Sequence, residues 1–146
     1  MQETEACLFF SRLLRDADKL DIWKVVTDYY HRKDGRRHEA LELNLPDTEG
    51  FSREVHRDIM NRTIIDMRHV KNMNDFKLLQ AGWIFDVNFK PTLISIRQRR
   101  YLELIRDALP QSKDMMAIFE TLQNFLAERM RLTPDAPPRP RFFPEG

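Results

Sequence analysis

The sequence predicts a mostly α-helical protein, and three observations support this prediction. Apolar residues recur at steps of three and four over long stretches, the spacing that lines one face of a helix. No run of residues has the alternating, β-branched character of a strand. Only 4 of the 146 residues are glycine while 32% are charged, a composition typical of solvated helix faces joined by few tight turns. We expect five to six helices packed as one bundle.

Length and composition predict one globular domain followed by a tail. A chain of 146 residues with 42% hydrophobic residues is long and apolar enough to bury a substantial core. We place the helical domain at residues 1–132. Residues 133–146 contain five prolines, so we expect an extended, mobile tail there.

Charge and cysteine content narrow the partners and the compartment. The formal net charge of +1 argues against a binder of nucleic acid or another polyanion. Cys7 is the only cysteine, so the chain cannot form an internal disulfide and a reducing compartment fits best. No apolar run approaches the roughly 18 residues of a membrane helix. Glu3 and Glu5 stand where a signal peptide would carry positive charge. We therefore expect a cytoplasmic protein.

The first half of the chain predicts a long helix, a loop and a shorter helix. Residues 2–33 contain no glycine or proline, so they form one long helix or two helices end to end. One face of this helix is expected to pack into the core, and it carries Cys7, Phe10, Leu13, Leu14, Ala17 and Leu20. Residues 36–51 are predicted as a loop with a short extended segment at Leu41, Leu43 and Leu45. Ser52 is expected to cap a helix that runs to about Arg62.

The second half predicts three further helices. Asn74 or Asp75 is expected to cap a buried helix whose core face includes Phe76, Leu79, Trp83 and Val87. Asp86 lies inside this apolar run and needs a partner, because an unpaired buried carboxylate is costly. Pro91 suits the first turn of a helix that continues to Ala108 and ends before Pro110. A Met- and Phe-rich stripe over residues 115–130 predicts a last helix that faces the core or an interface.

The residues most able to carry chemistry lie in the stretch 13–21. Asp18 sits among apolar neighbours on the long helix, and such a carboxylate is a suitable oxygen ligand for a divalent metal. Lys19 beside it could contact a phosphate drawn to that metal. Judged on these residues alone, however, aspartates at helical spacing from Arg12, Arg15 and Lys19 are more typical of a solvated salt-bridge face.

A family resemblance adds to this interpretation. The motif Ala17-Asp18-Lys19-Leu20-Asp21 resembles the last motif of the HD-superfamily metal-dependent phosphohydrolases. Several downstream stretches also resemble the C-terminal region of bacterial HD-domain proteins, namely Asn74–Gln80, Trp83–Asp86, Asn88-Phe89 and Arg99–Leu102. The resemblance covers roughly residues 8–130.

The resemblance implies a fold and an activity. Members of the family are helical, so the chain would be part of an HD-domain-like helical bundle. They bind divalent metal ions, and Asp18 matches the final metal ligand while Lys19 matches the catalytic basic residue after it. The implied reaction is hydrolysis of a phosphate ester by a metal-activated water. The partner would be a phosphorylated small molecule or nucleotide, with Arg36 and Arg37 of the basic loop bordering the substrate cleft.

The chain departs from the family pattern upstream of Asp18. The family's early histidine and its His-Asp pair are missing, because no histidine precedes His31 and no His-Asp dipeptide occurs. One carboxylate cannot hold a catalytic metal, for which about three protein ligands are typical. None of the four histidines forms an i, i+4 pair with another, so we expect surface histidines. The chain thus resembles the C-terminal portion of an HD protein, inactive without an N-terminal HD partner segment.

A second hypothesis needs no catalysis. Without the upstream helices, apolar surface is left uncovered, and such patches usually mark interfaces. Phe9 and Phe10 on the long helix and the stripe over residues 115–130 are the surfaces we consider. The chain would then be a helical interaction or regulatory module that forms a homodimer.

Overall fold

The computed structural model describes residues 4–32 and 39–134, and this part of the chain is helical without a strand. The mostly-α prediction is confirmed, and six α-helices span seven residues or more. Residues 135–146 and the basic residues Arg36 and Arg37 lie outside the described residues. The elements are α1 (Glu5–Tyr30), α2 (Glu39–Glu42), α3 (Arg53–Met60), η1 (Met67–His69), α4 (Met73–Gly82), η2 (Trp83–Asp86), α5 (Lys90–Gln98), α6 (Tyr101–Asp107) and α7 (Lys113–Leu132).

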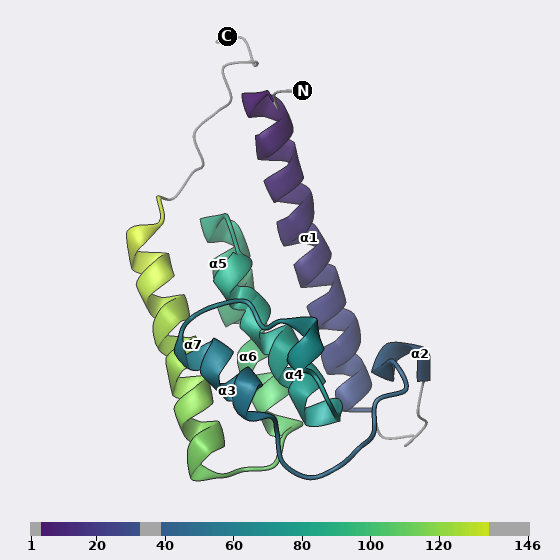
Figure 1. The fold of residues 1–146 in the computed structure, drawn as a ribbon. Helices are drawn as coiled ribbons and strands as arrows, with labels where there is room; N and C mark the ends of the chain where they lie inside the picture. Colours follow the sequence, from purple (N-terminus) through teal and green to yellow (C-terminus); the bar gives the residue numbers. More distant parts are fainter. Residues whose placement is uncertain (1–3, 33–38, 135–146) are drawn as a thin grey trace, which may run out of the picture.

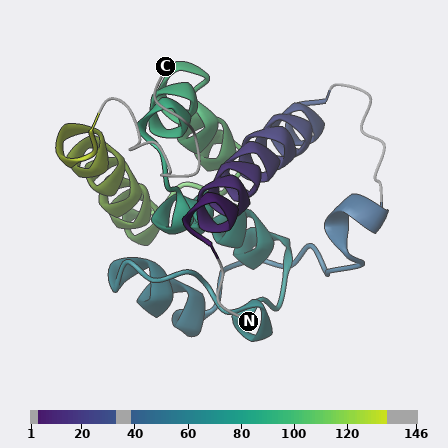
Figure 2. The same ribbon diagram turned by 90° about the horizontal axis from the view of Figure 1, so that it is seen from above.

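The two longest helices, α1 and α7, lie on either side of α5 and α6, and α2 lies on the outer side of α1 (Figures 1 and 2). Helix α5 packs against α7 and α1, α6 packs against α1 and α4, and α3 packs against α7 and α4. One hydrophobic core lies where these helices meet. Its fully buried side chains include Trp23, Leu78, Ile84, Leu93, Ile105, Ile118 and Leu122. The bundle therefore depends on contacts between segments far apart in the sequence.

Helix α1 is one continuous helix, as the absence of glycine and proline allows. Thr4 begins it by accepting a hydrogen bond from the Cys7 N–H at 3.1 Å. The predicted core face of its first half is wrong, because Cys7, Phe10, Leu13, Leu14 and Ala17 are all exposed. The reason is that another face of this half contacts the rest of the protein: Asp16 is buried against the start of α5, and the Phe9 ring contacts Phe89. Leu20, farther along, does pack against the core.

The loop before α3 does not contain the predicted short extended segment at Leu41, Leu43 and Leu45. Helix α2 is a single turn, and Leu43 and Asn44 adopt positive φ angles of 52° and 54°. Leu41 and Leu43 are exposed, while Leu45 packs against the core. Asn44 is of a residue type that favours the left-handed region, but a leucine at positive φ is uncommon, so the alternating leucines did not predict this turn.

Buried polar side chains at the start of α4 hold this segment in place. The Asn72 and Asn74 amides each donate to the Gly50 carbonyl at 3.0 Å. The Asp75 carboxylate accepts from the Ser52 N–H at 2.7 Å and from the Ser52 hydroxyl at 2.5 Å. Asp75 is fully buried, so its hydrogen bonds replace those it would make with water.

Two cap predictions are therefore wrong. Ser52 does precede α3, but its hydroxyl bonds Asp75 and makes no cap hydrogen bond to α3. The cap of α4 is Asn72, whose side chain accepts from the Asp75 N–H at 2.8 Å, and neither Asn74 nor Asp75. Near both helix starts several polar side chains can form hydrogen bonds with the backbone. The local sequence does not show which of them caps the helix.

The predicted helix from Pro91 to Ala108 is two helices. Pro91 lies in the first turn of α5 as predicted, but the chain breaks where Arg100 adopts the left-handed conformation at φ 57°. In a continuous helix, Tyr101 would lie about 140° around the axis from Ile96. Because both side chains are buried, the break lets α5 and α6 each turn an apolar face to the core.

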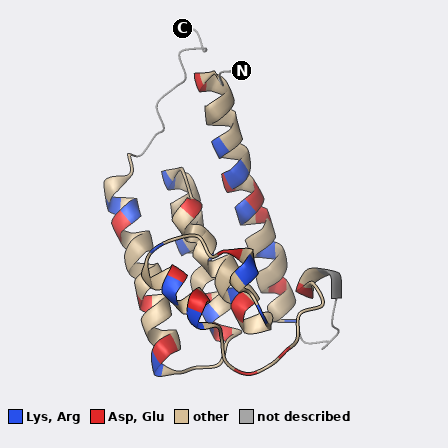
Figure 3. Cartoon of the chain, viewed as in Figure 1, with Lys and Arg blue, Asp and Glu red and all other residues tan. Residues whose placement is uncertain are grey.

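Charged residues of both signs are interspersed over the outer faces of the helices (Figure 3). The projecting end of α1 is mostly uncharged in this view, and charges gather farther along that helix. None of the helices in the described parts of the chain is long and apolar enough to cross a bilayer.

Candidate functional site

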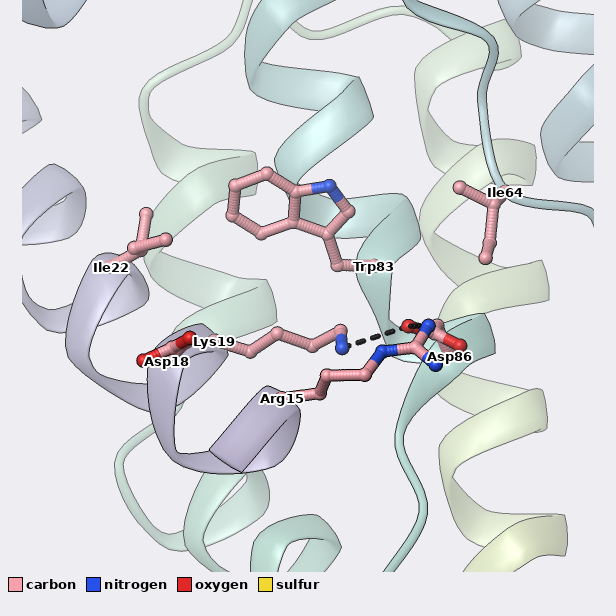
Figure 4. Close-up of a pocket in the computed structure, with 7 residues that line it drawn as sticks. All are labelled: Arg15, Asp18, Lys19, Ile22, Ile64, Trp83 and Asp86. Atoms are coloured by element: carbon pink, nitrogen blue, oxygen red, sulfur yellow. Dashed lines mark hydrogen bonds and ion pairs between the residues drawn. The ribbon is translucent and has the colours of Figure 1, made fainter. Parts of the chain in front are cut away.

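A pocket of about 390 Å³ opens between α1, η2 and the segment that follows α3. Figure 4 shows its lining: charged side chains of α1 and η2 meet at one end, and the Trp83 indole and Ile22 lie at the other. The lining residues are Arg15, Asp18, Lys19, Ile22, Ile64, Trp83 and Asp86. The pocket thus combines an apolar wall with a charged cluster.

Asp86 is the centre of the charged cluster. Its carboxylate accepts a hydrogen bond from the Arg15 guanidinium at 2.5 Å and pairs with the Lys19 ammonium at 2.9 Å. The prediction that Asp86 needs a partner is confirmed, and both partners come from α1. Burial, the largest single influence, raises the pKa of Asp86, yet Lys19 and Arg15 together bring it below its ordinary value.

The two residues predicted from the HD motif lie side by side in this pocket but differ in environment. Asp18 is exposed, and within the described residues it makes no hydrogen bond or ion pair. The Lys19 side chain is only 12% exposed and reaches across the pocket to Asp86 (Figure 4). Lys19 is therefore a fixed charge, while the Asp18 carboxylate is open to a ligand.

Asp86 gives the pocket a testable pH dependence. Its pKa is lower in the folded protein than in the unfolded chain, so its contribution to stability is present above its ordinary pKa and is lost as pH falls through the folded value. We expect the free energy of unfolding of the wild type to fall more steeply from about pH 5 to about pH 2 than that of Asp86→Asn. Urea denaturation at several pH values measures this, and identical slopes for the two proteins would contradict it.

The described residues do not fit a divalent metal. No group of three His, Cys, Asp or Glu side chains within residues 4–32 and 39–134 is arranged to hold one. Of the two carboxylates in the pocket, Asp86 is already paired with two cations. A metal beside Asp18 would thus have one ligand and two nearby positive charges, too few ligands for a catalytic ion.

Asp16, two residues before Asp18, has a structural role that sequence reasoning missed. Asp16 is 1% exposed and accepts hydrogen bonds from the start of α5. The donors are the Asn88 N–H at 3.0 Å, the Asn88 amide at 3.0 Å, the Phe89 N–H at 2.9 Å and the Thr92 hydroxyl at 2.7 Å. The one available signal is that Phe89, the residue that precedes α5, has no side chain able to cap it.

The histidines that the structure describes are occupied elsewhere. His31 hydrogen-bonds the Leu104 carbonyl at 2.7 Å, His69 contacts the Asp58 carboxylate at 2.7 Å, and His56 stacks on Phe51. They lie on different elements and do not line the pocket at Asp18. His38, like the predicted substrate contacts Arg36 and Arg37, lies outside the described residues.

A second opening of about 450 Å³ lies at the other end of α1. It includes Arg99 and Lys24, and the Lys24 ammonium is paired with Asp28 at 2.8 Å. Arg99 donates to the Tyr101 hydroxyl at 3.2 Å. Asp28, the one carboxylate among the described residues that line this opening, is paired with Lys24, whereas the Asp18 carboxylate is open to a ligand, so we place the functional site at Asp18.

Comparison of the chain with known protein families, with curated proteins and with solved structures finds no match. The class of protein that the fold defines is an α-helical bundle, and its functional assignment depends on the pocket.

Proposed function

We propose that the pocket at Asp18 is one half of a phosphate-ester hydrolysis site of the HD type, completed by residues of another polypeptide segment. One observation carries this proposal. Two of the stretches that bear the family resemblance, residues 17–21 and 83–86, line the same pocket. Arg15 and Asp86, which join α1 to η2 there, are 71 residues apart in the sequence. A solvated salt-bridge face would not require such a long-range arrangement.

Each charged residue has a role in this proposal. Asp18 offers the open carboxylate, and an N-terminal HD segment would supply the histidines and the further aspartate that a divalent ion needs. Arg15 is half exposed and uses one guanidinium nitrogen for Asp86, which leaves N–H donors for a phosphate oxygen. Lys19 holds Asp86 and adds positive charge at the site. The substrate class is a phosphorylated small molecule or nucleotide.

The test combines this chain with an N-terminal segment of an HD phosphohydrolase that carries the early histidine and the His-Asp pair. We expect the mixture to bind Mn²⁺ and to hydrolyse p-nitrophenyl phosphate, whereas each part alone does neither. Asp18→Asn should lower the hydrolysis rate at least about tenfold, because it removes a metal ligand. Calorimetry of Mn²⁺ binding and release of p-nitrophenol are the measurements.

The matched control is Asp21→Asn. Asp21 lies nearby on α1 and is exposed, but it does not line the pocket. The same chemical change there should leave the rate within about twofold, as surface substitutions usually do. A mixture that neither binds Mn²⁺ nor hydrolyses the ester, with both parts folded by circular dichroism, would overturn the proposal.

A second function is favoured by a different observation. Leu13 and Leu14 of α1 are exposed although apolar residues recur around them at helical spacing. This surface supports a helical interaction module without catalysis, and it would be present whether or not the pocket acts on phosphate esters.

A further inference from the structure

The projecting end of α1 presents an apolar surface. Its members are Cys7, Phe10, Leu13, Leu14 and Ala17, which we call the α1 face. All five are exposed, with Leu13 at 45% and Leu14 at 65%. Exposed leucines occur singly on most proteins, but here apolar residues follow one another over about three turns of one helix. The pattern points to a partner that packs along this helix.

We propose that the α1 face pairs with the α1 face of a second copy of this chain, with the two helices antiparallel. The spacing of four residues of this face alternates between three and four, which is the a and d spacing by which helices pair in coiled coils. These residues are Cys7, Phe10, Leu14 and Ala17. The partner is therefore a helix with the same spacing, and α1 of a second copy supplies one. This inference does not require the proposed hydrolysis activity, although Asp18 of that pocket would lie at the edge of the helix pair.

Two charged residues of α1 make a parallel pair of these helices unfavourable. The next two positions of the same repeat are Asp21 and Lys24. In a parallel pair each would face its own copy, and like charges so placed are destabilising. In an antiparallel pair centred on Arg12, both residues would lie beyond the start of the partner's α1, so neither would face its own copy.

Side-chain size and shape also fit the antiparallel pair. A two-fold axis near residue 12 places Cys7 opposite Ala17, small against small, and Phe10 opposite Leu14, large against large. On the flanks it brings Ser11 opposite Ser11 and Asp18 opposite Thr4, so no like charges meet there. Because the N-terminal end of α1 extends beyond the neighbouring ends of α5 and α7 (Figure 1), the two bundles would lie at opposite ends of the helix pair.

The area of the α1 face determines how tightly the two copies are expected to bind. Three helical turns bury less area than a standard interface, so the dimer should form only at high concentration. Sedimentation velocity of the wild type from micromolar to near-millimolar concentration should show a shift from monomer to dimer. Leu14→Glu should stay monomeric over the whole range, because a carboxylate would face the partner's Phe10.

The control variant Met116→Glu introduces the same negative charge at an exposed methionine outside the α1 face. Met116 is 67% exposed on α7, far from the α1 face in sequence and on another helix. This variant should dimerise like the wild type. A wild-type chain that remains monomeric at the highest concentration overturns the proposal, and so does a Leu14→Glu variant that dimerises normally.

Disulfide cross-linking tests the direction. In the antiparallel pair the two Cys7 residues are about 15 Å apart along the axis, beyond the reach of a disulfide. Oxidation of the wild type should therefore give little covalent dimer, while Ala17→Cys should give it readily because the introduced thiol faces the partner's Cys7. Ready cross-linking of wild-type Cys7 would indicate parallel helices and overturn the proposed arrangement.

Discussion

Asp16→Ala is expected to lower the free energy of unfolding by about 3 kcal/mol. The Asp16 carboxylate belongs to α1, and it holds the two residues that precede α5 and the Thr92 hydroxyl in the first turn of α5. Without it, the N–H groups of Asn88 and Phe89 and the hydroxyl of Thr92 lose their acceptor in a site that water does not reach freely. The same change removes one link between α1 and α5, while the ring contact of Phe9 with Phe89 remains. Urea denaturation followed by circular dichroism measures the loss.

Two further variants make this result specific. Asp16→Asn keeps one oxygen acceptor and should cost less than Asp16→Ala. Asp21→Ala removes an exposed aspartate from the same helix and should change stability by no more than about 0.5 kcal/mol. An Asp16→Ala protein as stable as Asp21→Ala would show that the hydrogen bonds from Asp16 to the start of α5 do not stabilise the fold.

Trp23→Ala is expected to lower the free energy of unfolding by about 4 kcal/mol. Trp23 is completely buried, with its ring 6.0 Å from Tyr101 and 6.4 Å from Trp83. Its indole N–H also donates to the Gln80 carbonyl at 2.9 Å. Removing the ring opens a cavity where α1, α4 and α6 meet. Thermal or urea unfolding gives the change in stability.

The comparison for this prediction is Trp83→Ala. Trp83 is partly exposed on the pocket wall, so its truncation creates less of a buried cavity and should cost less. Equal losses for the two variants would contradict the central position assigned to Trp23. Because these are the two tryptophans of the chain, Trp23→Ala also leaves the fluorescence of Trp83 as a reporter on the pocket.

The features that depend on local composition could be predicted from the sequence. A stretch without glycine or proline became the continuous helix α1, and Pro91 stands in the first turn of α5. The carboxylate of Asp86, placed in an apolar run, found cationic partners as the cost of burying a charge requires. These predictions needed only the neighbours of each residue.

Features that depend on distant segments were not predictable in the same way. The repeat of Phe10, Leu13 and Leu14 has the periodicity of a core face, and periodicity does not tell whether another element reaches that face. Asp16 resembled any charged residue of a helix, since its donors begin 72 residues later. At the break, Arg100 adopts a conformation that glycine usually adopts. An arginine at this position therefore did not predict the break.

Helix α1 makes its contacts with residues far downstream in the sequence, so it can dock only after those residues have been made. Its anchors lie far downstream, with Gln80 bonded to Trp23, Asp86 to Arg15 and Thr92 to Asp16. During synthesis α1 emerges first, and none of these anchors exists until some 60 to 75 further residues have been made. The earliest helix thus docks only after α4 and the start of α5 have been made, and closing these long loops makes folding slower than in a bundle of sequence-adjacent helices. Through that interval α1 is the segment most open to chaperones and to aggregation.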